Sequence, residues 1–168
     1  STMKFSPMIS NGQNYEQLTA TVVDSPFEGD SVLSPSTELV ISRQGGGENG
    51  SSLGYVIRGV GKEKFENNYK VTLSDTLARI CMPGAKANIS FDERFFVTHH
   101  YEGGLANIWL VDLLTQERYQ VTNMPPGGKA LFPHFRSDGW FYFLARVGED
   151  EFIIASDFAV ELAKSDSD

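Results

Sequence analysis

Hydrophobic and polar residues alternate along most of this 168-residue chain, in short runs that Gly, Pro, Asn and Asp separate. Alternation with a period of two places successive side chains on opposite faces of a β-strand. The predicted strands are residues 15–23, 38–43, 53–60, 69–73, 76–81, 94–101, 106–112, 118–122, 140–146 and 151–156. Sixteen glycines and frequent turn residues favour short strands joined by tight turns over a helical bundle. The pattern therefore predicts an all-β fold.

The alternating pattern also repeats. Residues 124–144 (MPPGGKALFPHFRSDGWFYFL) match residues 82–97 in order: a Met-Pro turn, a Lys-Ala pair, an apolar run, an acidic turn and an aromatic-rich strand. A fainter copy begins at Pro26 and continues through residues 34–41. Self-similarity at roughly 40 to 50 residues is typical of a β-propeller. We expect about three propeller-like blades of antiparallel strands, with a β-sandwich as the alternative fold.

The repeat defines the expected domain organisation. Residues 1–14 are polar and predict a flexible N-terminal segment, residues 15–163 one repeat domain, and residues 164–168 a disordered tail. Three units fall below the usual minimum of four blades in a propeller. The sequence leaves three solutions open: a degenerate fourth blade near the N-terminus, a piece of a longer protein, or a homo-oligomer in which two copies complete one ring.

The two ends of the repeat look complementary. The final unit lacks outer strands, and the strand at residues 15–23 has no earlier partner. Within that strand, residues 17–19 (QLT) resemble residues 120–122 (QVT), which directly precede the last copy of the repeat. Joining such ends in one blade hides strand edges. We therefore expect residues 15–23 to complete the blade begun by the C-terminal strands, in this chain or in a neighbouring one.

Charge and cysteine content narrow the classes of partner. The formal net charge is −8 and there is no basic block, which argues against nucleic-acid binding through phosphate contacts. No apolar stretch of about 20 residues is present, so the sequence predicts no membrane span. The lone Cys81 excludes an intrachain disulfide and a zinc site built from several cysteines. We predict no cofactor and no metal.

The repeat resembles the TolB-like, WD40-like β-propeller repeats of exported bacterial proteins. Those repeats contain a Ser-Pro-Asp-Gly turn before an apolar strand, then a strand that ends in aspartate, then a Leu-Thr strand. The corresponding segments here are residues 34–37, 91–94 and 137–140 for the turn, and residues 107–112 and 119–123 for the two strands. The resemblance implies a periplasmic or secreted scaffold that binds proteins or glycans. It transfers no catalytic residues, because the shared positions are structural.

Three histidines are candidates for chemistry. His99 and His100 are adjacent on a predicted strand, next to Tyr101, so their imidazoles point to opposite faces and do not easily share one metal ion. We expect a structural or surface role for them. His134 lies within the apolar run of the repeat, where a neutral, hydrogen-bonded imidazole near the core is the expected state. The alternative is a hydrolase or lyase that combines His99, His100 or His134 with a carboxylate.

Exposed aromatic residues and a long loop are the candidates for binding. Trp140 and Tyr142 are two residues apart in the aromatic-rich strand, so both point to one face, where they could stack on a sugar ring or hold a peptide. The glycine-rich loop at residues 44–52, with Glu48 and Asn49, is a second candidate contact for a partner. The sequence thus predicts a non-catalytic binding or scaffold module that recognises a protein or carbohydrate partner.

Overall fold

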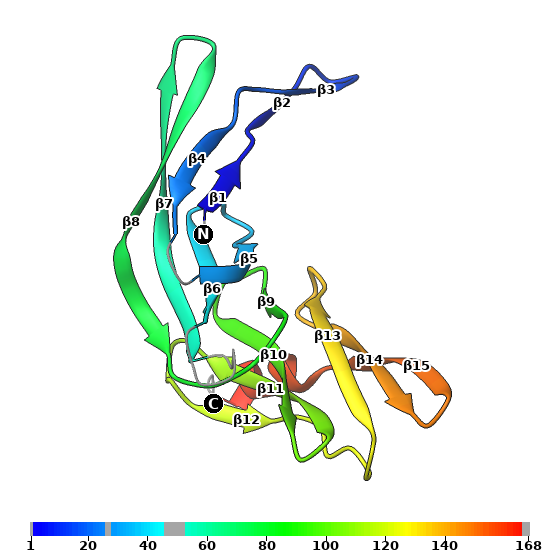
Figure 1. Ribbon diagram of the computed structural model, residues 1–168. Helices are drawn as coiled ribbons and strands as arrows, with labels where there is room; N and C mark the ends of the chain where they lie inside the picture. Colours follow the sequence, from blue (N-terminus) through cyan, green and yellow to red (C-terminus); the bar gives the residue numbers. More distant parts are fainter. Residues whose placement is uncertain (1, 26–27, 46–52, 166–168) are drawn as a thin grey trace.

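The computed structural model describes residues 2–25, 28–45 and 53–165 (Figure 1). Within these ranges the strands are β1 (Thr2–Phe5), β2 (Met8–Ser10), β3 (Tyr15–Gln17), β4 (Thr21–Asp24), β5 (Glu28–Leu33), β6 (Leu39–Gln44), β7 (Gly54–Phe65), β8 (Asn68–Ile80), β9 (Ala87–Ile89), β10 (Phe95–Glu102), β11 (Leu105–Asp112), β12 (Arg118–Gln120), β13 (Lys129–Phe135), β14 (Phe141–Val147) and β15 (Asp150–Ser156). The helix α1 (Phe158–Ser165) follows them. No helix in these ranges is long and apolar enough to cross a membrane.

Most of the strands form three antiparallel groups in which neighbours in sequence are neighbours in space. We call β5–β8 blade 1, β9–β12 blade 2 and β13–β15 blade 3. In Figure 1 the first strands of the three blades, β5, β9 and β13, lie nearest one another, and the later strands of each blade lie farther out. Blades 2 and 3 share one sheet through a single parallel pair, Ala106 with Lys129. The prediction of all-β, propeller-like blades is confirmed, and the strand order is not that of a β-sandwich.

The repeated turn of the sequence is also repeated in the backbone. Thr37, Glu93 and Gly139 occupy equivalent positions and have positive φ angles of 63°, 60° and 88°. The N–H group of each donates to the carbonyl three residues earlier, at 2.8, 3.0 and 3.1 Å. The serine or aspartate immediately before each of them accepts a hydrogen bond from the N–H two residues further on. These side chains cap their own turns, as the sequence predicts.

Blade 2 is buried on both faces because its strands supply side chains to two cores. Phe96 on β10 points to the core shared with blade 1, where its ring lies 4.7 Å from the ring of Tyr55. The next residue, Val97, points to the core shared with blade 3, together with Leu110 and Phe141. Strand alternation thus sends neighbouring residues into different interfaces between blades. These two cores hold the three blades together.

The N-terminal segment departs from one prediction and narrows another. Residues 1–14 were expected to be flexible, yet β1 pairs with β4 and β2 pairs with β3. Residues 15–23 were expected to complete the C-terminal blade of this chain or of a neighbouring one. Within this chain β4 pairs with β1 and lies beside β8 of blade 1, so the first option is wrong. The reason is burial: Met3 and Phe5 pack on Val40 and its neighbours in blade 1. We call the β1–β4 pair the N-terminal ribbon.

Two further boundaries differ from the prediction. The charged residues 62–68 were expected to be a connection between strands. They instead extend β7 and begin β8 on either side of a tight turn. The reason is that this hairpin projects into solvent, where charged side chains are compatible with a strand. The predicted disordered tail, residues 164–168, begins inside α1, which ends at Ser165. Residues 166–168 lie outside the described ranges.

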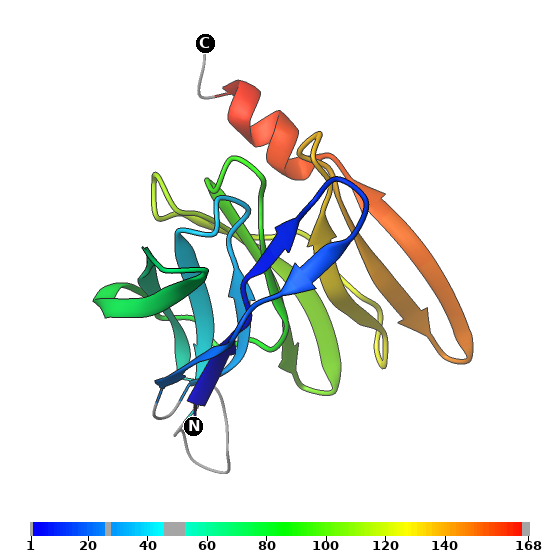
Figure 2. The ribbon, with the colours of Figure 1, turned by 90° about the horizontal axis from the view of Figure 1, so that it is seen from above.

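Blade 3 departs from the repeat after its third strand. Where blade 2 continues into β12, the chain after β15 enters α1 instead. The helix buries Ala159 against the core between blades 2 and 3, and the ring of Phe158 lies 5.7 Å from that of Tyr119 on β12. Figure 2 shows α1 beginning next to the end of β15 and extending away from it at one end of the blades. Blade 3 therefore has three strands in the described structure.

An ion pair closes the end of blade 2. Arg94 Nη2 lies 2.6 Å from Asp112 Oδ2, and the Asp112 side chain is almost fully buried. Asp112 also accepts a hydrogen bond from the N–H of Leu114 at 2.8 Å. Burial alone would raise the pKa of Asp112, but the hydrogen bonds from Arg94 and the backbone outweigh it and hold the pKa below its ordinary value. The carboxylate is therefore a charged, structural group.

We expect Asp112→Ala to lower the free energy of unfolding by about 2 to 3 kcal/mol, because the charged hydrogen bonds that Arg94 and the backbone donate to this buried carboxylate are lost. Urea unfolding followed by circular dichroism measures the change. The control is Glu151→Ala, which breaks the exposed pair with Arg146 and should cost less than about 1 kcal/mol. Equal losses in the two variants would contradict a structural role for Asp112.

Candidate functional site

Three rings meet where blade 2 and blade 3 join, and we call them the aromatic seam: His99, Tyr101 and Phe132. His99 and Tyr101 are two residues apart on β10 and share a face, with ring centroids 5.4 Å apart. Phe132 comes from β13, and its ring lies 5.3 Å from that of His99. His99 is only 2 % exposed, whereas Tyr101 is 50 % and Phe132 46 % exposed. Two accessible rings thus lie over a buried imidazole.

A bulge in β13 aims Phe132 at blade 2. The pairing of β13 with β14 shifts register between Leu131 and His134, and Phe132 has a positive φ of 54°. Its N–H donates to Nδ1 of His99 at 3.3 Å. A positive φ in a residue other than glycine costs on the order of 1–3 kcal/mol, and such strain concentrates at functional positions. Bulges commonly redirect a side chain in this way.

The imidazole of His99 is neutral at physiological pH. Burial lowers its pKa to about 4, and the positive charge of Lys86 adds to the effect. The unprotonated Nδ1 can then accept the hydrogen bond from Phe132, which protonation would abolish. The expectation of a structural role for His99 therefore agrees with its surroundings, and its ring is not accessible to a substrate.

The other two histidines lie elsewhere. His100 is half-buried on the opposite face of β10, as alternation predicts. His134 is exposed, which corrects the expectation that it lies near the core, because the bulge turns it outward. Its Nδ1 hydrogen-bonds the carbonyl of Phe132 at 3.1 Å, so the expected hydrogen bond is present. In the described ranges no cluster of three His, Cys, Asp or Glu side chains could hold a metal ion.

The predicted aromatic pair joins His134 on one side of blade 3. Tyr142 is the partner of His134 across β13 and β14, and Trp140 precedes Tyr142 by two residues. Ile153 on β15 lies on the same side. We call these four residues the open face of blade 3, and all of them are exposed. The predicted contacts Glu48 and Asn49 lie outside the described residues.

A charged trio ties blade 1 to blade 2. Asp30 on β5 forms ion pairs with Arg43 on β6, at 3.0 Å, and with Lys86, which precedes β9. The hydrogen bond from Lys86 is the main reason that the pKa of Asp30 lies below its ordinary value. Sequence reasoning missed this trio because Asp30 lies outside every predicted strand. The repeated Lys-Ala pair at Lys86 and Lys129 was the available signal.

A buried tyrosine supports the chain next to the trio. The hydroxyl of Tyr55 donates to the carbonyl of Ala85 at 2.9 Å and lies 2.6 Å from the hydroxyl of Thr98. Burial raises the pKa of Tyr55 to about 12, so it stays protonated. Because Thr98 precedes His99, this network fixes the strand that carries the aromatic seam.

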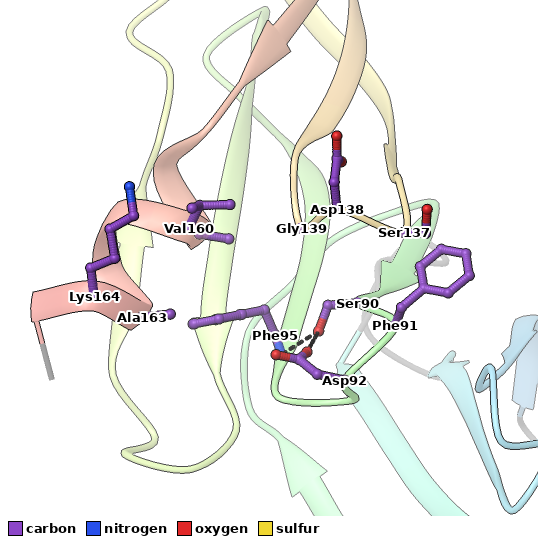
Figure 3. A pocket seen from close by; sticks show the side chains of 11 residues that line it. Ser90, Phe91, Asp92, Phe95, Ser137, Asp138, Gly139, Val160, Ala163 and Lys164 are labelled. Carbon is purple, nitrogen blue, oxygen red and sulfur yellow. Dashed lines mark hydrogen bonds between the residues drawn. The ribbon is translucent and has the colours of Figure 1, made fainter. Parts of the chain in front are cut away.

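Two cavities lie away from the seam. One of about 370 Å³ lies between the turns of blades 2 and 3 and α1, lined partly by Phe91, Phe95 and Val160 (Figure 3). The two carboxylates that line it accept hydrogen bonds from their own turns. Asp92 accepts from the N–H of Arg94, and Asp138 accepts from the N–H of Trp140. The other, of about 960 Å³, lies between residues 2–9 and blade 1. Neither cavity brings a histidine to a carboxylate.

Comparisons with known proteins are informative only at the level of structure. No family model matches the chain, and no curated protein sequence matches it. TolB from Acinetobacter baumannii is similar in structure, with 17 % identity and a TM-score of 0.48, over 91 % of this chain and 35 % of that one. A protein assigned as TolB from Agrobacterium tumefaciens is also similar in structure, with 13 % identity and a TM-score of 0.46, over 92 % of this chain and 73 % of that one. The chain resembles part of TolB.

The depressed pKa of His99 predicts a pH-dependent stability. The unfolded chain takes up a proton near pH 6.5 and the folded chain only near pH 4, so stability should fall as the pH drops from 6.5 to 4. The loss is at most about 3 kcal/mol. Urea unfolding at several pH values measures it. His99→Gln, which keeps an acceptor but does not titrate, is the control and should flatten this part of the profile; an unchanged profile would contradict the assignment.

Proposed function

We propose that this chain is a non-catalytic interaction module that recognises a protein partner through the aromatic seam. The observation that carries the proposal is the pair of accessible rings, Tyr101 and Phe132, held against the buried His99. Rings whose position is already fixed lose little conformational entropy on binding, and aromatic residues dominate the binding energy of many interfaces.

The neighbouring charges support a protein partner. Lys86 lies near the seam, since its charge lowers the pKa of His99, and it is ion-paired with Asp30, which also pairs with Arg43. Aromatic side chains with nearby arginine are enriched at protein–protein interfaces. A carbohydrate partner stays the other outcome of the test. The resemblance to exported bacterial propeller repeats supports a location in the bacterial envelope or outside the cell.

The alternative of a hydrolase or lyase has less support. The three histidines do not converge: His99 is buried, His100 lies on the opposite face of the same strand, and His134 is exposed on β13. In the described part of the chain none of the three hydrogen-bonds a carboxylate, the arrangement that a general base and its orienting group require.

Binding tests of two matched variants examine the proposal. The wild-type chain is immobilised and exposed to an extract of bacterial envelope proteins and, separately, to a glycan array; the affinity of each identified ligand is then measured by calorimetry. Tyr101→Ala should weaken binding of a protein ligand about tenfold or more, because a partly buried aromatic anchor is lost. The control is Leu114→Ala, an exposed residue in the turn after β11, which should leave the affinity unchanged.

Three results would contradict the proposal. One is the absence of any ligand. Another is a ligand whose affinity is the same for Tyr101→Ala and the wild type. A third is selective capture of a glycan, which would replace the protein partner by a carbohydrate.

A further inference from the structure

Blade 3 is incomplete on its outer edge. In blade 1 the third strand, β7, is covered by β8, and in blade 2 the third strand, β11, is covered by β12. Within residues 2–25, 28–45 and 53–165, no strand pairs with the outer edge of β15. That strand also exposes Phe152, Ile153 and Ile154 in a row. A long, apolar and unpaired edge is a template for an additional strand.

The missing strand can be described by its counterpart in blade 2. Blade 2 pairs Val97 with Leu110, and blade 3 pairs Tyr142 with Ala155 in the same register. Val97 and Leu110 are fully buried, whereas Tyr142 is 42 % exposed. The two hairpins thus present equivalent surfaces, and only one of them is covered. By the same register, Ile153 corresponds to Ile108.

Ile108 shows which groups the missing strand must satisfy. Its carbonyl accepts a hydrogen bond from the N–H of Val121 at 2.9 Å. Its N–H donates to the hydroxyl of Thr122, also at 2.9 Å. A strand that covers Ile153 in the same way has three residues in order. The first lies opposite Ile154, as Gln120 lies opposite Trp109; the second donates its N–H to the carbonyl of Ile153; the third is a threonine whose hydroxyl accepts from the N–H of Ile153.

The chain contains a second segment with this sequence. Gln17-Leu18-Thr19 matches Gln120-Val121-Thr122, and it continues from β3. Every residue of β2 and β3 is exposed, and the hairpin that they form extends away from the blades (Figure 1). It is held by three residue pairs, by hydrogen bonds around Asn11 in its own turn, and by the hydrogen bond from the N–H of Leu18 to the carbonyl of Pro7. An isolated two-stranded hairpin of this kind is only marginally stable.

Connectivity prevents this segment from reaching β15 of its own chain. Thr21, two residues after Thr19, begins β4, which is paired with β1 and lies beside β8 of blade 1. The side chain of Thr21 also approaches the carbonyl of Tyr69 on β8, at 3.5 Å. In Figure 1 blade 1 and β15 lie on opposite sides of the molecule. The segment can therefore complete blade 3 only in another molecule.

We infer that two copies of this chain complete each other by strand exchange. Residues 15–19 of each copy leave β2 and pair antiparallel with β15 of the other copy, as the fourth strand of blade 3. In the register of β12, Gln17 lies opposite Ile154. The N–H of Leu18 gives up its hydrogen bond to the carbonyl of Pro7 and donates instead to the carbonyl of Ile153. The N–H of Ile153 donates to the hydroxyl of Thr19. The inference is independent of the proposed partner binding.

The mass in solution and a designed cross-link test the pairing. Light scattering coupled to size-exclusion chromatography should give about twice the chain mass of 18.6 kDa. In a Cys81→Ser background, Gln17→Cys combined with Ile154→Cys should form a disulfide-linked dimer, because opposed residues in a non-hydrogen-bonded pair are close enough for a disulfide. Gln17→Cys combined with Leu114→Cys is the control and should stay unlinked.

Two substitutions distinguish this pairing from other dimers. Leu18→Pro removes the N–H that pairs with Ile153, and it should give a monomer with the thermal unfolding of the blades retained. Thr19→Val keeps the shape but removes the acceptor, and it should weaken the dimer about tenfold. Gln13→Ala, in the turn between β2 and β3, should change nothing. A monomeric wild type, a dimer insensitive to Leu18→Pro, or no cross-link between positions 17 and 154 would overturn the inference.

Discussion

An apolar face of a β-sheet is removed from water only when another layer covers it, and that constraint organises the whole chain. Blade 2 satisfies it on both sides, because neighbouring residues of β10, Phe96 and Val97, point into two different cores. Blade 1 satisfies it on one side with blade 2 and on the other with the N-terminal ribbon, through Met3 and Phe5. Blade 3 satisfies it on one side only.

The same requirement separates structural from accessible residues at equivalent positions. Val97 and Tyr142 occupy the same place in successive blades, and the first is buried while the second is exposed. Tyr142 and Trp140 are neighbouring exposed aromatic residues, which is typical of a binding site. In the other blades, however, the next sheet covers the equivalent positions. The aromatic seam is different, since Tyr101 and Phe132 are exposed where blades 2 and 3 already pack together.

Strain and polarity at the seam reinforce each other. The bulge holds Phe132 in a backbone conformation that is unfavourable for an aromatic residue, and the hydrogen bond from its N–H to His99 helps to stabilise it. That bond requires a neutral imidazole, which burial secures by lowering the pKa of His99. The charged trio of Asp30, Arg43 and Lys86 joins blades 1 and 2, and the charge of Lys86 contributes to the lowered pKa of His99.

The sequence by itself determined the outer strands of the blades, the repeat and the turns, because these depend on local alternation and on residues such as Gly139 and Asp92 that act within a few positions. It did not predict the innermost strands β5, β9 and β13, whose residues read as turns or short apolar runs. It also predicted that His99 and His100 point to opposite faces. The tertiary structure decided the rest. Whether β4 pairs with β1 or with a distant strand, and whether His134 is buried or turned outward by a bulge, depends on contacts between segments far apart in the chain. Burial of those contacts has no local signature in the sequence.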